Sequence, residues 1–155
     1  MQTKKVVSVV CLLCVLVFLF GCGGSLSKSA IKGDLSGVKF YLGKGEAVNQ
    51  IDSTGWTPLL WATYYNYYPI VDYLLNHGAN PNFQSTAVQG DILKGSTALI
   101  IAAYYGQPDT VKILLARGAD KNIKNSEGET ARSLAVKYSF TDVVNLLDQD
   151  VPAVK

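Results

Sequence analysis

An internal repeat constrains this chain more than any other feature of its sequence. The stretch GWTPLLWA begins at Gly55, and it returns as GSTALIIA from Gly95 and as GETARSLA from Gly128. The threonines of the three copies lie 40 and then 33 residues apart. One copy is too short to bury its own apolar face, so the copies must stack on one another to form a continuous core.

A second segment that is also similar between the copies follows the first one. The stretch VDYLLNHGANPN from Val71 matches VKILLARGADKN from Val111, and a more divergent copy, GDLSGVKFYLGKGEAVN, starts at Gly33. Valine and leucine recur at helical spacing, and the glycines that follow suit a left-handed position at a helix end. Each repeat is therefore predicted to hold two helices and a loop. Three threonines suit the start of each first helix: Thr57, Thr97 and Thr130.

A 33-residue unit with a Thr-Pro-Leu start resembles the ankyrin repeat. The resemblance covers residues 29–150, which is nearly all of the chain after its apolar N-terminus. It implies an all-α solenoid of about four helix-turn-helix repeats with projecting loops. Their approximate bounds are residues 29–51, 52–84, 85–124 and 125–150.

The repeats differ at the ends of the array and at one internal loop. Arg132 and Asp148 replace leucines of the middle repeats, as expected of a terminal repeat with a polar outer face. Residues 151–155 are predicted to be a frayed tail. The longer spacing between the second and third copies places seven extra residues within 85–94. They are either a tolerated lengthening of a surface loop or an additional partner contact.

The N-terminus carries a separate signal. Residues 6–20 are apolar except for Ser8, and two lysines precede them. This run is shorter than the ~20 residues of a spanning helix and fits a secretory signal. It ends in LFGC, which resembles a bacterial lipobox. The resemblance implies a cleaved signal peptide at residues 1–21, acylation of Cys22 with fatty acids such as palmitate, and a tether at residues 22–28.

Two alternatives to the lipoprotein remain for this segment, namely an uncleaved single-pass anchor and a secreted soluble protein. Gly23 follows the cysteine, where an aspartate would favour retention in the inner membrane of enteric bacteria. We therefore expect a lipid-anchored protein of the bacterial envelope, on the outer membrane and facing the periplasm. One acyl chain holds a protein only marginally, whereas two or more anchor it stably.

Charge and composition disfavour several function classes. The chain has 14 Lys and Arg against 12 Asp and Glu, and the loss of Lys4 and Lys5 with the signal peptide would bring the net charge to zero. A folded part with no net positive charge is not expected to bind nucleic acid. The three cysteines all lie within the first 22 residues, and His77 is the single histidine. Disulfides, thiolate sites and histidine metal clusters are thereby disfavoured in the folded part. We expect no cofactor, no metal and no enzymatic activity.

Aromatic residues are the strongest functional signal. Pairs of tyrosines follow the first helix in two repeats, and a single tyrosine follows it in the last. In ankyrin proteins this helix end lies on the concave face, which together with the loop tips usually meets the partner. Tyrosine and tryptophan dominate interface hot spots. The predicted partner-binding residues are Trp56, Tyr64, Tyr65, Ser96, Tyr104, Tyr105, Glu129 and Tyr138.

The sequence thus predicts a non-catalytic binding module that presents an aromatic concave surface to an envelope protein. Two roles fit, namely support or regulation of an envelope enzyme and neutralisation of a toxin that acts in the periplasm. Rival hypotheses are a glycan- or peptidoglycan-binding envelope protein and an exported factor that binds host proteins. We expect the protein to act as a monomer with an unidentified protein partner.

Overall fold

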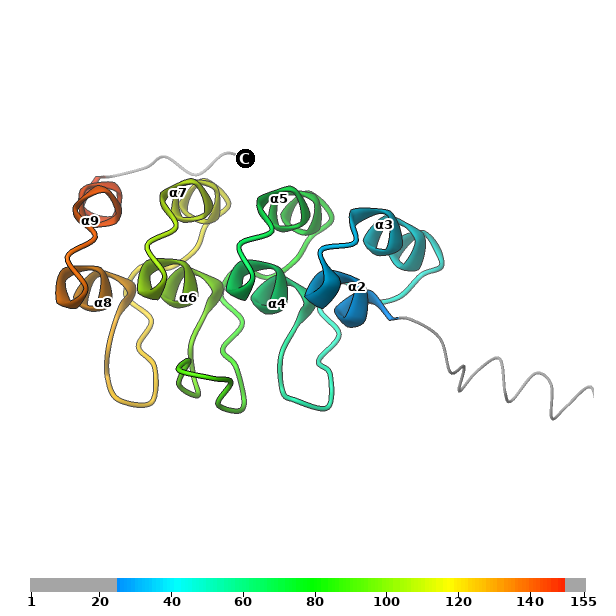
Figure 1. Cartoon of the computed structure of the whole chain (residues 1–155), viewed down its shortest axis with the longest axis horizontal. Coiled ribbons are helices and arrows are strands. Elements are labelled where there is room, and N and C mark those ends of the chain that lie inside the picture. Colours follow the sequence, from blue (N-terminus) through cyan, green and yellow to red (C-terminus); the bar gives the residue numbers. More distant parts are fainter. Residues whose placement is uncertain (1–24, 150–155) are drawn as a thin grey trace, which may run out of the picture.

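Four helix pairs stand side by side in a line in the computed structural model, which describes residues 25–149. The signal peptide, Cys22 and the tail predicted from the sequence lie outside the described residues. The last part of the predicted tether is not a free linker, because residues 26–28 begin the first helix and Leu26 is buried. The pairs form two layers, with α2, α4, α6 and α8 in one and α3, α5, α7 and α9 in the other (Figure 1). The helices are α2 (Leu26–Lys32), α3 (Leu35–Gly43), α4 (Pro58–Tyr64), α5 (Tyr68–Asn76), α6 (Ala98–Tyr104), α7 (Pro108–Ala116), α8 (Ala131–Lys137) and α9 (Thr141–Asp148).

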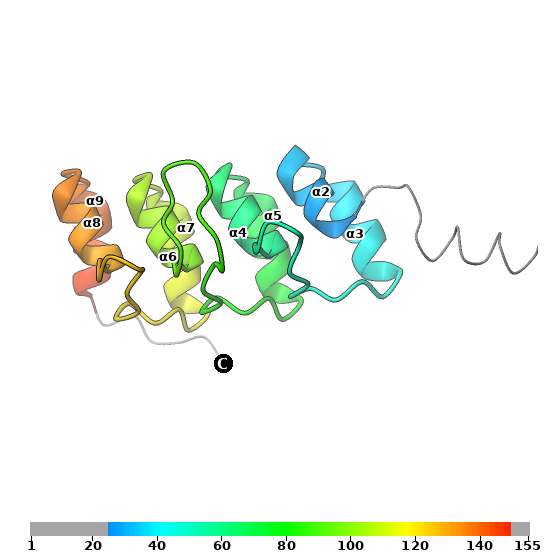
Figure 2. The same ribbon diagram turned by 90° about the horizontal axis from the view of Figure 1, so that it is seen from below.

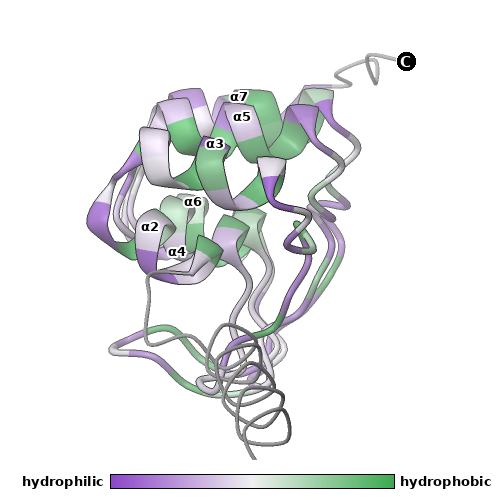
Figure 3. Cartoon of the chain, turned by 90° about the vertical axis from the view of Figure 1, so that its right-hand side faces the viewer, coloured by the Kyte–Doolittle hydropathy of each residue, from purple (hydrophilic) through white to green (hydrophobic). Residues whose placement is uncertain are grey.

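The described part of the chain is therefore an all-α ankyrin-type solenoid, as the sequence predicted. Seen along the stack, the two helical layers lie one above the other and the loops project from one side (Figure 3). No helix within residues 25–149 combines the length and the hydrophobicity that crossing a membrane requires.

Threonine caps set where the first helices of repeats two to four begin. Each threonine side-chain oxygen accepts a hydrogen bond from the backbone N–H three residues further along the chain. The distances are 3.4 Å for Thr57, 3.3 Å for Thr97 and 3.2 Å for Thr130. Such a bond satisfies one of the donors that a helix start leaves unpaired, and losing it costs ~1 kcal/mol. The capping role that the sequence predicted for these threonines is confirmed.

One continuous core runs through the stack. Ala62, Ala102 and Ala135 are fully buried where α4, α6 and α8 pack on one another. Their small side chains let neighbouring helices approach closely. Leu74 and Leu114 fill the space between the layers, each fully buried. Burial of a leucine side chain contributes ~1.5–3 kcal/mol, so a core of this kind holds the repeats in one arrangement.

Asparagines link each repeat to the next on the loop side. The Asn49 amide oxygen accepts from the Asn80 N–H at 2.7 Å, and the Asn49 amide nitrogen donates to the Gly78 carbonyl at 3.2 Å. Asn82 repeats both bonds one unit further on, with the Asp120 N–H at 2.8 Å and the Gly118 carbonyl at 3.1 Å. These bonds fix the register between consecutive repeats.

Polar contacts close both ends of the stack. The Arg132 guanidinium donates to both carboxylate oxygens of Asp148, at 2.6 and 2.9 Å, on the outer side of the last helix pair. The Glu46 carboxylate accepts from the Leu26 N–H at 2.9 Å at the other end. The predicted polar outer face of the terminal repeat is thus present.

The inserted residues form a folded-back loop on the side of the first-layer helices that faces away from the second layer (Figure 1). Each long loop is closed by one backbone bond, from Asp52 to Trp56, from Ser85 to Ser96 and from Asn125 to Glu129. The middle loop encloses seven residues more than the other two. Its tip is tightened by paired bonds between Gln89 and Ile92, and Figure 2 shows it rising over the helices. The insertion is therefore an ordered part of the solenoid surface.

Candidate functional site

The tyrosines lie where the first-layer helices end. Tyr64 and Tyr104 are the last residues of α4 and α6, and Tyr65, Tyr105 and Tyr138 follow at the C-caps of α4, α6 and α8. The chain turns toward the second layer at these positions, so the side chains are left beside one another on the surface. We call Tyr65, Tyr64, Tyr105, Tyr104 and Tyr138 the tyrosine row.

Ring contacts join the tyrosine row without a gap across three repeats. Each ring meets the next edge to face, with centroid distances of 5.0 Å for Tyr65 to Tyr64, 5.5 Å for Tyr64 to Tyr105, 4.9 Å for Tyr105 to Tyr104 and 4.9 Å for Tyr104 to Tyr138. Edge-to-face pairs place the positive edge of one ring against the negative face of another. The row is consequently a preorganised aromatic surface. Its ends are the more open parts, since Tyr65 is 42% exposed and Tyr138 41% exposed.

Two tryptophans form the floor beneath one end of the row. Trp56 is 0% exposed and lies 5.7 Å from Tyr64 and 4.8 Å from Trp61 between ring centroids. The Trp61 indole N–H donates to the Asp52 carboxylate at 2.6 Å, while the Trp56 indole N–H donates to the Ala87 carbonyl of the inserted loop at 3.3 Å. The prediction that Trp56 lines an open groove is wrong, because its side chain turns into the core and supports the row from below.

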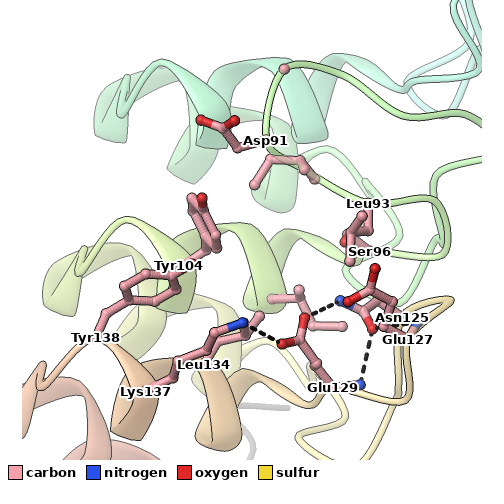
Figure 4. A pocket seen from close by; sticks show the side chains of 13 residues that line it. Asp91, Leu93, Ser96, Tyr104, Asn125, Glu127, Glu129, Leu134, Lys137 and Tyr138 are labelled. Carbon is pink, nitrogen blue, oxygen red and sulfur yellow. Dashed lines mark hydrogen bonds and ion pairs between the residues drawn. The ribbon is translucent and has the colours of Figure 1, made fainter.

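The inserted loop makes a pocket at the other end of the row. Residues 90–93 of this loop face Tyr104, Tyr138 and Leu134 across a cavity of about 320 Å³ (Figure 4). Ile92 is 2% exposed, so its side chain anchors the loop to the solenoid. Gly90 lies close to the Tyr64 hydroxyl, with only 2.7 Å between that oxygen and the position of a Cβ. The insertion thus walls a cavity that a shorter loop would leave open.

A polar network fixes the wall of the pocket opposite the inserted loop. The Glu129 carboxylate accepts from the Asn125 amide at 3.1 Å and from the Lys137 ammonium at 3.0 Å, as drawn in Figure 4. These two hydrogen bonds lower the pKa of Glu129, and the hydrogen bond that Lys137 donates to Glu129 raises the pKa of Lys137. Asn125 in turn accepts from the Glu127 and Glu129 N–H groups at 3.0 and 2.9 Å.

Two hydroxyls of the tyrosine row, those of Tyr104 and Tyr105, have raised pKa values. A side-chain hydrogen bond with Tyr138 is the main cause that raises the pKa of Tyr104 to about 12, and the charges of Asp91 and Glu129 add to it. Burial raises the pKa of Tyr105, with a further contribution from a hydrogen bond with Tyr64. Tyr104 and Tyr105 therefore keep their hydroxyl protons at neutral pH.

The structure brings most of the predicted site residues together. Tyr104, Glu129 and Tyr138 line the pocket, and Tyr64, Tyr65 and Tyr105 continue the surface from it. Ser96 also borders the pocket but is 1% exposed, since its backbone N–H donates to Ser85 and its carbonyl closes the inserted loop. The expectation that Ser96 offers an accessible contact is therefore wrong.

Nine of the 13 pocket residues were not among the site residues predicted from the sequence, and they include Asp91, Ile92, Leu134 and Lys137. The adjacent apolar residues Ile92 and Leu93 of the insertion were the signal that this part of the loop packs inward. Within residues 25–149 no group of three or more histidine, cysteine or acidic side chains is arranged to hold a metal ion.

The family model for ankyrin repeats, described as three copies, matches residues 26–125 and 86–153. The chain belongs to the ankyrin-repeat family. Ankyrin repeats are protein-binding modules, and the family is generally non-catalytic. The protein is thus an ankyrin-repeat, protein-binding solenoid, as predicted at this level from the sequence.

The alignment with each of three individual relatives covers about one third of this chain. It is 39% identical over 59 residues to the human DNA-binding protein RFXANK, which is 37% of this chain and 23% of that protein. It is 36% identical over 58 residues to a protein of Borreliella burgdorferi named for its ankyrin repeats, at 37% and 26% coverage. It is 46% identical over 55 residues to the palmitoyltransferase AKR1 of Lachancea kluyveri, at 35% and 8% coverage. The chain therefore spans about a quarter or less of these relatives.

Proposed function

We propose that this ankyrin-repeat protein binds a protein of the bacterial envelope through the tyrosine row and the adjoining pocket, without catalysing a reaction. The observation that carries the proposal is the unbroken set of edge-to-face ring contacts from Tyr65 to Tyr138 across three repeats. A surface of this kind offers large apolar area together with hydroxyl groups that accept and donate hydrogen bonds.

Rigidity of the surface favours tight binding. Each ring of the row is held by its neighbours, and the floor is held by hydrogen bonds from Trp56 and Trp61. Side chains that are ordered before association lose little entropy when the partner binds, and each rotamer-rich side chain that needs no further ordering saves ~0.5–1.5 kcal/mol. Tyrosine and tryptophan are also the residues most enriched among interface hot spots.

The lipid anchor is part of the same proposal. Acylation of Cys22 would hold the solenoid at the membrane, facing the periplasm, and would raise its local concentration near membrane-bound partners. Metabolic labelling of the full chain with a palmitate analogue tests this step. We expect incorporation in the wild type and none in a Cys22→Ser variant, and equal labelling of both would refute the anchor.

Two roles are compatible with such a protein, and the identity of the partner separates them. An envelope enzyme that changes activity on binding indicates support or regulation. A secreted toxin whose activity in the periplasm is blocked on binding indicates immunity. Either role places the solenoid as a monomer against one partner, which sedimentation of the purified complex would measure.

Affinity capture tests the protein-binding function. Full chain in mild detergent is the bait for envelope extracts, next to a Tyr65→Ala/Tyr138→Ala variant that removes the two most open rings of the row. The matched control is Phe40→Ala, because Phe40 is 56% exposed but lies on α3 in the other helical layer. We expect one protein to be retained by the wild type and the control and lost by the double variant.

Two outcomes would overturn this proposal. Equal retention of a partner by all three baits would exclude the tyrosine row as the binding surface. Binding of the wild type to purified peptidoglycan, with no retained protein, would replace the protein partner by a glycan. Circular dichroism of each bait shows whether the substitutions leave the solenoid folded.

A further inference from the structure

The pocket beneath the inserted loop has two carboxylates that take part in no hydrogen bond or ion pair among residues 25–149, although the charge of Glu127 also acts on Lys137. These are Asp91 of the inserted loop and Glu127 of the following loop, which are both solvent-exposed. The third carboxylate, Glu129, is balanced by Lys137 at 3.0 Å. The four charged lining residues thus leave a net charge of −2 at the pocket, all of it on the two free carboxylates.

The rest of the pocket is aromatic and apolar. Tyr104 and Tyr138 form one wall, with centroids 4.9 Å apart and planes at 70°, and Leu134 forms the base. The electron-rich face of an aromatic ring attracts a cation, and this attraction strengthens where water is partly excluded. A hydrogen bond with Tyr138 is the main cause of the raised pKa of Tyr104, and the nearby negative charges of Asp91 and Glu129 raise this pKa further.

We propose that this pocket binds one arginine side chain presented by the protein partner, with the guanidinium on the Tyr104 ring and between the carboxylates of Asp91 and Glu127. The Tyr138 ring already has a cation of its own chain over it, since Lys137 Nζ lies 5.7 Å from its centroid. The inference rests on the proposed protein-binding function and assigns the chemistry that the partner must carry. Because the inserted loop supplies Asp91 and one wall of the cavity, it gives the insertion a specific role in recognition.

Arginine fits this site better than lysine does. Its planar guanidinium stacks on aromatic faces and forms two parallel hydrogen bonds with a carboxylate, whereas an ammonium is a compact and strongly hydrated charge. A cavity of about 320 Å³ also lies at the lower end of the range of ligand pockets, which suits one long side chain and its adjoining backbone.

A peptide titration tests the chemistry directly. The full chain, with isotopically labelled tyrosine, is titrated in detergent micelles with the capped tripeptide Gly-Arg-Gly and, in parallel, with the peptide in which citrulline replaces arginine. Citrulline keeps the shape of arginine but lacks its charge. We expect saturable shifts of the Tyr104 and Tyr138 ring signals with the arginine peptide, and at least fivefold weaker binding of the citrulline peptide. Equal binding of the two peptides, or no shift at either ring, would overturn the proposal.

Variants distinguish the effect of the pocket carboxylates from the effect of negative charge elsewhere on the surface. An Asp91→Asn/Glu127→Gln variant removes both free carboxylates while keeping side-chain size, and Asp109→Asn is the matched control because Asp109 is exposed on α7 outside the pocket. The double variant should weaken binding of the arginine peptide at least fivefold, and the control should leave it unchanged. Equal affinity of the double variant and the wild type would contradict the assignment.

The same variant distinguishes this inference from the proposed function. A partner that is retained by the wild type and by the Asp91→Asn/Glu127→Gln variant alike, but lost by Tyr65→Ala/Tyr138→Ala, would overturn the arginine pocket and leave the protein-binding surface standing. Loss of the partner with both variants, and retention with Asp109→Asn, would support the two together. Binding of the arginine peptide without any retained partner would count against the protein-binding function alone.

Discussion

The Tyr64 ring meets the Tyr105 ring edge to face, with centroids 5.5 Å apart and planes at 89°, and this contact joins the second repeat to the third within the tyrosine row. The two residues are about one repeat apart in the chain, and only stacking of α4 on α6 brings them together. The pair therefore links the stability of the solenoid to the shape of the surface proposed to bind a partner.

This pair should show energetic coupling in a double-mutant cycle. An edge-to-face aromatic contact contributes ~0.5–1.5 kcal/mol beyond the area it buries, so Tyr64→Ala and Tyr105→Ala should be non-additive by that amount in urea unfolding. The control cycle pairs Tyr105→Ala with Phe40→Ala, whose ring contacts lie in the first repeat. Additivity of the first cycle would mean that the two rings are not in contact.

Ionisation of Tyr104 gives a second test. Its pKa is raised to about 12, whereas an unfolded tyrosine loses its proton near pH ~10. The folded state then holds this proton more tightly, so the stabilisation is complete below pH ~10 and is lost as the pH rises through about 12. A Tyr138→Phe variant should lower the Tyr104 pKa toward its ordinary value, because the bond with Tyr138 is its main cause. NMR titration of the isotopically labelled tyrosine rings measures the Tyr104 pKa in the wild type and in the Tyr138→Phe variant.

The asparagine links between repeats predict a stability difference. Asn82→Ala removes the bonds to the Asp120 N–H and the Gly118 carbonyl, and we expect a loss of ~1–2 kcal/mol in the free energy of unfolding. Asn122→Ala is the matched control, since the side chain of Asn122 bonds to Asp120 within its own repeat. Equal losses for the two variants in urea unfolding would show that the link between repeats contributes nothing.

Substitutions in the turns between paired helices should change the stability of the fold in opposite directions. Gly106 has φ +62°, and a Cβ there would lie 2.6 Å from the Phe140 ring, so Gly106→Ala should destabilise the fold by ~1–3 kcal/mol. Ser139 holds the equivalent turn of the last repeat at φ 61°, and Ser139→Gly should stabilise the fold by up to ~1 kcal/mol. Thermal unfolding checks both, and a stabilising Gly106→Ala would contradict the packing described.

Repetition explains why the fold could be predicted from the sequence. The Thr57 cap, the buried Ala62 and the Leu74 column each recur at the same offset, so several independent signals agree on one unit. Helix ends follow from local chemistry, and the stacking of copies follows from the need to bury the apolar face of each one. The tyrosine row could be predicted on the same basis, because its members stand at equivalent positions of three repeats.

The inward residues and the pocket could not be predicted in this way. Trp56 and Ser96 precede the threonine caps, and whether such a side chain faces solvent depends on how its loop closes, which the repeat pattern does not encode. The inserted loop has no counterpart in the other repeats, so the positions of Asp91 and Ile92 follow only from the packed structure. The Glu129 to Lys137 pair likewise depends on the path of a loop relative to α8.

Site-specific photocrosslinking in living cells tests the central claim most directly. A photoreactive amino acid replaces Tyr65 or Tyr138 at the two ends of the tyrosine row, or Phe40 on the other helical layer, where exposure is at least as high. The account predicts a covalent adduct with the same envelope protein from Tyr65 and Tyr138 and none from Phe40. An adduct formed from Phe40 alone, or equally from all three positions, would contradict the assignment of the tyrosine row as the partner-binding surface.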